Sequence, residues 1–272
     1  MLFKCQITIL KSWFYLQRIS TLKHHLAAIA LLISASCHAD PLFTVSTGFD
    51  YSSGTYGDSR HSETLYIPLG LKYETSEWTF KATIPYVESS GPADTIGNGS
   101  DRINLNNGST GHRTSSGLGD IVVSASRTVW QQGPWLLELG AKVKWATASE
   151  KDGLGTGKND YTGQADLYRV FGKHTLFATL GAKKMGDPDG VNLKNPLFTS
   201  LGWSMKASDR TSLGLTYDFR QKIQDSGSPV REATAFATRR LDTHWKLLGY
   251  VVTGFSNASP DLAGGMFVYY TY

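Results

Sequence analysis

One stretch of eleven residues, 135–145, restricts the fold of this chain more than any other. Its apolar side chains occupy every second position, and charged residues or glycine occupy most positions between them. The apolar set starts and ends with tryptophan, and its members are Trp135, Leu137, Leu139, Ala141, Val143 and Trp145. Because side chains of a β-strand alternate between its two faces, the stretch predicts a strand with one apolar and one charged face.

The length of this strand indicates what each face meets. A rise of about 3.3 Å per residue and a tilt of about 40° give eleven residues a height of roughly 25–28 Å. That is the height of the apolar band of a bilayer, and aromatic residues favour its two boundaries. The stretch therefore predicts a wall strand of an outer-membrane β-barrel, with lipid outside and water inside.

Residues 1–39 are of a different kind and predict a secretory signal peptide. They hold four basic residues and no acidic one, and an apolar run over 26–36 precedes Cys37-His38-Ala39. A basic segment, a short apolar run and a small residue are the parts of such a peptide. We expect cleavage after Ala39, leaving residues 40–272 as the barrel; acylation of Cys37, as in a lipoprotein, is the alternative.

The composition of residues 40–272 excludes several kinds of protein. The chain has 27 basic and 23 acidic residues, and four basic residues lie before residue 40, so the remainder is close to neutral. This balance gives no argument for a nucleic-acid partner. Both cysteines lie in the first 39 residues, so no disulfide framework is expected. No apolar run approaches 18 residues after residue 39, so no transmembrane helix is expected.

The alternating pattern recurs along the rest of the chain. About twelve segments carry it: 42–53, 62–74, 77–87, 118–131, 134–147, 160–171, 174–185, 196–206, 211–223, 230–241, 245–256 and 261–272. Their connections alternate between short and long, as the periplasmic turns and external loops of bacterial barrels do. The sequence thus predicts an all-β, antiparallel, up-and-down transmembrane barrel with both ends in the periplasm; a soluble sandwich or closed barrel is the alternative.

Three segments need separate mention. The longest connection, 88–117, is rich in Gly, Ser, Asn and Asp, and we expect it to be mobile or to fold over the barrel mouth. Arg127 and Arg169 fall on outward faces near the periplasmic end, where long side chains reach the interface. For 231–240 and 245–256 the pattern does not decide which face is outward.

Charged side chains on the inward faces are the candidate functional residues. Either they line an aqueous channel and set its charge preference, or they pair across strands and fill a narrow lumen. Asp120, beside Gly119 where the backbone can bend, is expected to pair with Lys142 or Lys144. The candidates are Lys72, Lys81, Asp120, Glu138, Lys142, Lys144, Asp166, Lys183, Asp218, Arg220 and Lys222.

Other motifs favour plain structural interpretations. The glycine-rich stretch 153–158 lacks the spacing of a phosphate loop, and 187–190 has too few oxygen ligands for calcium, so we expect a flexible loop and a turn. His61 and His112 fall on the external side, and Ser115 or Ser116 is near in sequence, which is the basis of a rival hypothesis, a lipid hydrolase at the rim. The sequence indicates no third partner. No cofactor and no metal site are expected.

The chain also resembles a known family in the order of three motifs. They are Gly-Leu-Gly-Asp-Ile at 117–121, Gly-Ala-Lys-Val-Lys-Trp-Ala-Thr at 140–147 and Gly-Leu-Gly-Thr-Gly-Lys-Asn-Asp-Tyr at 153–161. This order is similar to the outer-membrane barrel family named after the MetA pathway of phenol degradation. The family usually has a Pro-Thr-Gly-like turn where Ala-Thr-Ala stands at 146–148. The resemblance implies passage of small, often aromatic or hydrophobic compounds across the outer membrane.

From these observations we expect a passive channel for small solutes in the outer membrane of a Gram-negative cell, reached through the periplasm. Its expected partners are membrane lipid, lipopolysaccharide and the solute. The final strand, ending in Tyr272, resembles the signal that the outer-membrane assembly machinery reads. The rim hydrolase and a closed structural barrel remain as alternatives.

Overall fold

A computed structural model describes residues 41–97, 101–105 and 111–272. The expected signal peptide, and with it Cys37, lies outside the described residues. The strands are β1 (Leu42–Gly54), β2 (Ser62–Glu74), β3 (Trp78–Pro92), β4 (Thr95–Ile96), β5 (Ile103–Asn104), β6 (His112–Leu118), β7 (Ile121–Gln132), β8 (Trp135–Trp145), β9 (Asp160–Phe171), β10 (His174–Lys184), β11 (Leu197–Lys206), β12 (Thr211–Arg220), β13 (Val230–Arg240), β14 (Trp245–Gly254) and β15 (Leu262–Thr271). No helix in these ranges is long and apolar enough to cross a membrane.

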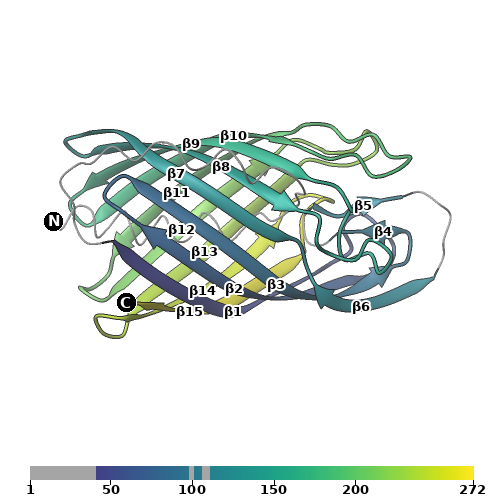
Figure 1. Ribbon diagram of the computed structural model, residues 1–272, viewed down its shortest axis with the longest axis horizontal. Coiled ribbons are helices and arrows are strands. Elements are labelled where there is room, and N and C mark those ends of the chain that lie inside the picture. Colours follow the sequence, from purple (N-terminus) through teal and green to yellow (C-terminus); the bar gives the residue numbers. More distant parts are fainter. Residues whose placement is uncertain (1–40, 98–100, 106–110) are drawn as a thin grey trace.

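The strands close into one antiparallel barrel (Figure 1). Each wall strand pairs with the next in sequence, and β1 pairs with β15 to complete the ring. β6 and β7 pair with successive parts of β3, so they form one long wall strand interrupted at Gly119 and Asp120. Counted this way the barrel has twelve strands, which confirms the predicted fold class and the expected bend beside Asp120.

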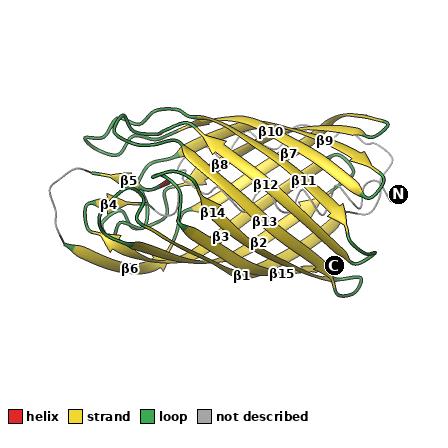
Figure 2. Cartoon of the chain, turned by 180° about the vertical axis from the view of Figure 1, so that it is seen from behind, coloured by secondary structure: helices red, strands yellow, loops and turns green. Residues whose placement is uncertain are grey.

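The two ends of the barrel differ (Figure 2). Short turns join the strands at the end where the last strand finishes, and we call this the turn end. Long connections and the small β4–β5 hairpin gather at the opposite end, which we call the loop end. This is the predicted alternation of short and long connections.

The side chains are distributed in the reverse of a water-soluble protein. Large apolar residues are exposed on the outer face, with Leu180 64% and Leu201 59% accessible, whereas charged residues such as Glu138 and Lys183 are buried inside. A contiguous apolar exterior is unfavourable in water and favourable in hydrocarbon. Closure also satisfies the backbone groups of every wall strand, as a bilayer requires. The architecture is therefore that of a membrane barrel.

Aromatic side chains surround the turn end of the outer face. Trp245 contacts Tyr270, and Phe43 contacts Tyr272, with ring centroids 4.8 and 5.8 Å apart. Arg127 lies over the ring of Trp78 at 5.5 Å and its Nη2 is 2.9 Å from Glu77 Oε2. Arg169 lies over the ring of Trp135 at 5.0 Å. The predicted outward position of both arginines at this end is confirmed, and each lies against an aromatic face. Their reach to the membrane interface stays a prediction.

The structure shows which face is outward in 231–240 and 245–256, the two segments for which the alternating pattern did not decide. Phe236 of β13 and Leu248 of β14 are buried inside the barrel, while Ala235 and Val251 are exposed on its outer face. The outer face of β13 has three alanines between Arg231 and Arg239, which explains why its hydrophobicity did not indicate the outward face.

The predicted bounds of the loop, 88 and 117, are both wrong. β3 continues to Pro92 and β6 begins at His112, so the two strands extend as a polar hairpin beyond the rest of the wall (Figure 1). Above the membrane neither face meets lipid, so a strand there needs no apolar alternation. Its Ser, Thr and Gly residues therefore gave the signal of a loop.

Candidate functional site: the lumen and its loop-end mouth

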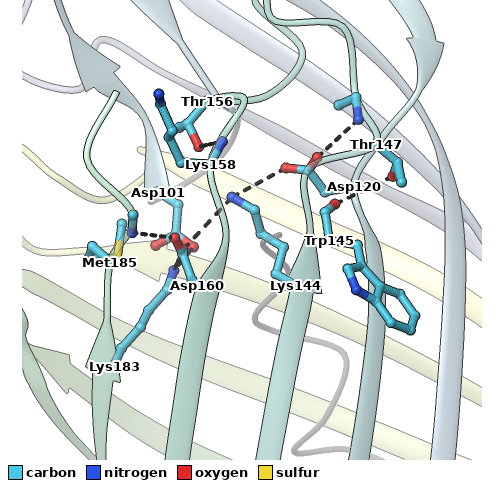
Figure 3. A network of polar contacts seen from close by, with 12 residues as sticks. Asp101, Asp120, Lys144, Trp145, Thr147, Thr156, Lys158, Asp160, Lys183 and Met185 are labelled. Atoms are coloured by element: carbon cyan, nitrogen blue, oxygen red, sulfur yellow. Dashed lines mark hydrogen bonds and ion pairs between the residues drawn. The ribbon is translucent and has the colours of Figure 1, made fainter. Parts of the chain in front are cut away.

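A network of buried ion pairs lies inside the wall near the loop end (Figure 3). Lys144 of β8 lies between two carboxylates, with its Nζ 3.2 Å from Asp120 Oδ2 and 3.8 Å from Asp160 Oδ2. Lys183 of β10 places its Nζ 3.0 Å from the same oxygen of Asp160. The predicted pairing of Asp120 with Lys144 is confirmed. Lys144 is paired with Val122 and Lys142 with Ser124, so Lys144 stands two residues nearer to Asp120 along the strand.

One member of this network comes from a loop. The segment formed by residues 93–97 and 101–105 carries the β4–β5 hairpin, and we call it the mouth loop. Its Asp101 is 2.7 Å from Lys183 Nζ and also pairs with Arg220 of β12. The six residues of the network are Asp101, Asp120, Lys144, Asp160, Lys183 and Arg220. The network contains three positive and three negative charges, so its net charge is zero. Its main effect is therefore to hold the mouth loop in place, and it adds little electrostatic potential to the lumen.

The mouth loop reaches across the barrel. On one side its Ile103 is buried together with Ile223, and Asn104 exchanges two hydrogen bonds with the side chain of Gln224, of 3.1 and 2.9 Å. On the other side Arg102 Nη2 donates to Thr64 Oγ1 of β2 at 3.4 Å. Since β2 and β12 lie on opposite parts of the ring, the mouth loop covers the opening. This confirms the expectation that the long connection folds over the mouth.

A cavity of about 280 Å³ remains under the outer loops at this end. Arg102, Tyr56 and Asn104 line it, together with residues 223–224 and 226–228. The Arg102 guanidinium lies over the ring of Tyr56, 4.7 Å from its centroid. Burial lowers the pKa of Arg102 and raises the pKa of the Tyr56 phenol, because the charged form of each loses water. The size is close to that of small-ligand pockets.

Most predicted inward charges are inside the barrel, and each makes local contacts. Three carboxylates accept hydrogen bonds from threonines: Glu138 from Thr128 at 3.1 Å, Asp166 from Thr179 at 2.6 Å and Asp218 from Thr216 at 3.0 Å. Lys72 pairs with Glu74, and Lys142 is buried. Lys81 lines a cavity of about 40 Å³ together with Lys72 and Tyr269. Lys222 is the exception, because it follows the end of β12 and donates to the backbone carbonyl of Asp225 in an outer loop. It does not line the wall.

The turn-end half of the lumen holds apolar side chains beside the charged Lys72, Lys81 and Glu138. A buried cluster there contains Leu136, Tyr168, Val170, Phe177, Phe236, Leu248, Phe267 and Tyr269. Phe177 stands directly opposite Gly202 on the neighbouring strand, and a methyl group added at that glycine would overlap the ring. Phe236 and Gly214 form a second pair of this kind. Each glycine thus leaves the space in which an aromatic ring lies against the wall.

The rim carries one serine–histidine contact. Ser53 Oγ and His61 Nε2 are 2.6 Å apart on the β1–β2 hairpin at the loop end. In the described part of the chain no carboxylate or amide holds the other ring nitrogen of His61. His112, the second histidine of the hydrolase hypothesis, lies at the start of β6 and forms no such pair with a serine of the described residues.

The remaining motifs form local structure. Asp187 Oδ1 accepts from the backbone of Leu193 at 2.8 Å, and Val191 donates to the carbonyl of Pro188 at 3.0 Å, so 187–190 belongs to a folded turn as predicted. Across 41–97, 101–105 and 111–272, no three His, Cys, Asp or Glu side chains converge as metal ligands.

Comparison with known structures assigns the fold. No protein-family model and no curated protein sequence matches this chain. A KdgM porin covers 84% of this chain and 99% of its own at a TM-score of 0.50 and 9% identity; a KdgM porin in complex with disordered oligogalacturonate gives the same coverage and identity at 0.52. The transport unit of the autotransporter AIDA-I from Escherichia coli covers 89% and 93% at 0.50 and 13% identity. The chain shares the fold of outer-membrane β-barrels. The narrower resemblance to the phenol-degradation family stays a prediction.

Four residues of the mouth were not predicted. Asp160 has the same parity as Thr162 and Asp166 on β9, so the alternation of that strand could have found it. Asp101, Arg102 and Tyr56 lie in connections, where no alternation exists to tell which side chains turn inward.

Proposed function

We propose that this protein is a passive channel for small solutes in the outer membrane of a Gram-negative cell, with the turn end in the periplasm and the loop end outside. The observation that carries the proposal is the reversal of sidedness in a closed barrel: apolar residues face outward and buried charges face inward. An apolar exterior is stable in contact with lipid, and a polar interior is stable in contact with water and polar solutes. Its fold is shared with porins.

The interior suits slow, selective passage of small molecules. The mouth loop narrows the entrance, and the apolar cluster around Phe177 and Phe267 narrows the turn-end half. A solute with an aromatic or hydrophobic body gains contact with this cluster as it passes, whereas a hydrated ion does not. We therefore propose aromatic or hydrophobic compounds as the solute class, in agreement with the family resemblance.

The test is conductance in planar bilayers combined with liposome swelling. Purified residues 40–272 should give steady ion current, and liposomes should swell faster with phenolic solutes than with sugars or fatty acids of equal concentration. Phe177→Ala should raise the conductance, and Leu201→Ala, on the lipid face, should leave it unchanged. Intact barrels without current would contradict the channel and leave the closed structural barrel.

The contact between Ser53 and His61 favours one second candidate, a lipid hydrolase at the rim. A histidine at this distance can take the proton of a serine nucleophile. Release of fatty acid from phospholipid vesicles, lost in Ser53→Ala and retained in Ser115→Ala, would support it. No release by the intact protein would exclude it.

A further inference from the structure

The cavity at the loop end contains polar atoms that the rest of the structure leaves without partners. Nε and Nη1 of Arg102 and the hydroxyl of Tyr56 are all buried, and no described residue accepts a hydrogen bond from them, although Ser52 lies close enough to donate one to the Tyr56 oxygen. An unsatisfied buried donor is unfavourable, and an unpaired buried guanidinium more so. Both residues line the 280 Å³ cavity, so a molecule bound there is placed to supply the missing acceptors.

The charges around the cavity favour an anion. Arg220, which also lines it, is held by Asp101. The one acidic residue in the lining is Asp58, and it is engaged by Arg60, whose Nη2 lies 3.0 Å from Asp58 Oδ2. Among the described residues Arg102 has no acidic partner of its own. The cavity therefore presents one uncompensated positive charge.

The backbone at Tyr56 gives an independent indication. Tyr56 has a φ of 50°, the one positive φ among the described non-glycine residues. A bulky side chain is strained in this left-handed region, and such strain persists where the surroundings hold it. Here it keeps the aromatic ring beneath the guanidinium and the hydroxyl in the cavity.

From these three observations we propose that the cavity is a binding site for the carboxylate of a small organic acid, with Arg102 as its charged donor and Tyr56 Oη as a second donor. Arginine is suited to carboxylates because its planar group offers several donors at a fixed charge. The inference deepens the proposed channel function and rests on it for the role of the site, which is to select the solute at the entrance. Together with the aromatic cluster below, it points to an aromatic carboxylate.

Direct binding to the full chain, folded in detergent, tests the site without requiring a channel. Benzoate is the probe, and benzamide is its uncharged match; both are titrated by calorimetry against the same micelles. We expect benzoate to bind and benzamide to bind at least tenfold more weakly. Arg102→Gln should weaken benzoate about tenfold or more, as expected for loss of a charged hydrogen bond. Arg231→Gln, exposed at the same end, is the matched control and should bind as the native chain does.

Tyr56→Phe removes one hydroxyl and should weaken benzoate about threefold, which provides a test if Arg102→Gln does not fold. Folding of each variant is checked by its shift on gels with and without boiling. Equal binding of benzoate and benzamide, or equal benzoate binding by native chain and Arg102→Gln, would overturn the proposal. If inorganic phosphate binds more tightly than benzoate in a competition titration, the assignment to carboxylates is overturned. Binding without conductance would retain the site and reject the channel.

Discussion

Replacing Asp101 with asparagine should release the mouth loop from the barrel wall. The carboxylate is mostly buried and meets two cations, Lys183 at 2.7 Å and Arg220. Asparagine keeps the shape and loses both charged contacts. Lys183 retains Asp160 at 3.0 Å, and the amide oxygen of asparagine can still accept a hydrogen bond from Arg220. The loss is therefore closer to that of a charged hydrogen bond than to that of an orphaned buried charge. We take about 2 kcal/mol, which raises the population of the open loop roughly thirtyfold.

Trypsin can measure this population, because the mouth loop carries Arg102. Cleavage of a transiently opened segment follows its equilibrium population when opening is fast compared with cleavage. The Asp101→Asn protein, folded in detergent, should therefore be cut after Arg102 about thirty times faster than the native chain. Asp225→Asn is the control, since its pair with Lys194 is exposed in an outer loop and should leave the rate unchanged. Cleavage at the native rate in Asp101→Asn would refute the view that these ion pairs fix the loop.

Three other predictions concern the wall and the outer loops. Gly202→Ala places a methyl group against an aromatic ring of the next strand and should destabilise the barrel by about 1–3 kcal/mol, measured as a lower midpoint of heat unfolding. Gly163→Ala is the control, because a methyl group there meets open space and should leave the midpoint unchanged. Leu201→Arg puts a charge on the lipid face and should make folding into vesicles less favourable by roughly 2–4 kcal/mol, the cost of arginine near the bilayer midplane. An unfolding midpoint equal to that of the native chain would contradict an outward position. Hydrogen bonds from Arg60 lower the pKa of Asp58 to about 2, so the contribution of this carboxylate is present above pH 4 and lost as the pH falls through about 2. Carbon NMR should show that pKa returning toward its ordinary value in Arg60→Gln, and an unchanged pKa would mean that another cause holds it.

The sequence predicted the wall well because the membrane imposes a simple rule on it. Where a strand faces lipid, every second residue must be apolar, so the bounds of β2 and β9 could be read to the residue. The rule fails where lipid ends. The upper parts of β3 and β6 are polar on both faces and were taken for a loop.

The site was predictable only in part, for the same reason. Lys144 and Asp120 lie on wall strands or beside them, and parity placed both inside. Arg102 and Tyr56 lie in connections, and their meeting depends on how two loops fold against each other across the mouth. No local pattern encodes such a meeting. The contact of Ser53 with His61 joins the two ends of one hairpin connection. It was not predicted, because other serines lie as near to the external histidines in the sequence.

In the proposed channel, the pairing of inward phenylalanines with glycines determines how the width of the passage can differ between related chains. A ring that lies flat over a glycine occupies room that the neighbouring strand has given up, so the two positions act as a unit in setting the local bore. A larger residue at Gly202 would swing the ring of Phe177 toward the axis and narrow the passage while leaving the phenylalanine itself unaltered. Relatives that retain such rings and differ in the opposite glycines should therefore differ in the girth of the molecules they admit.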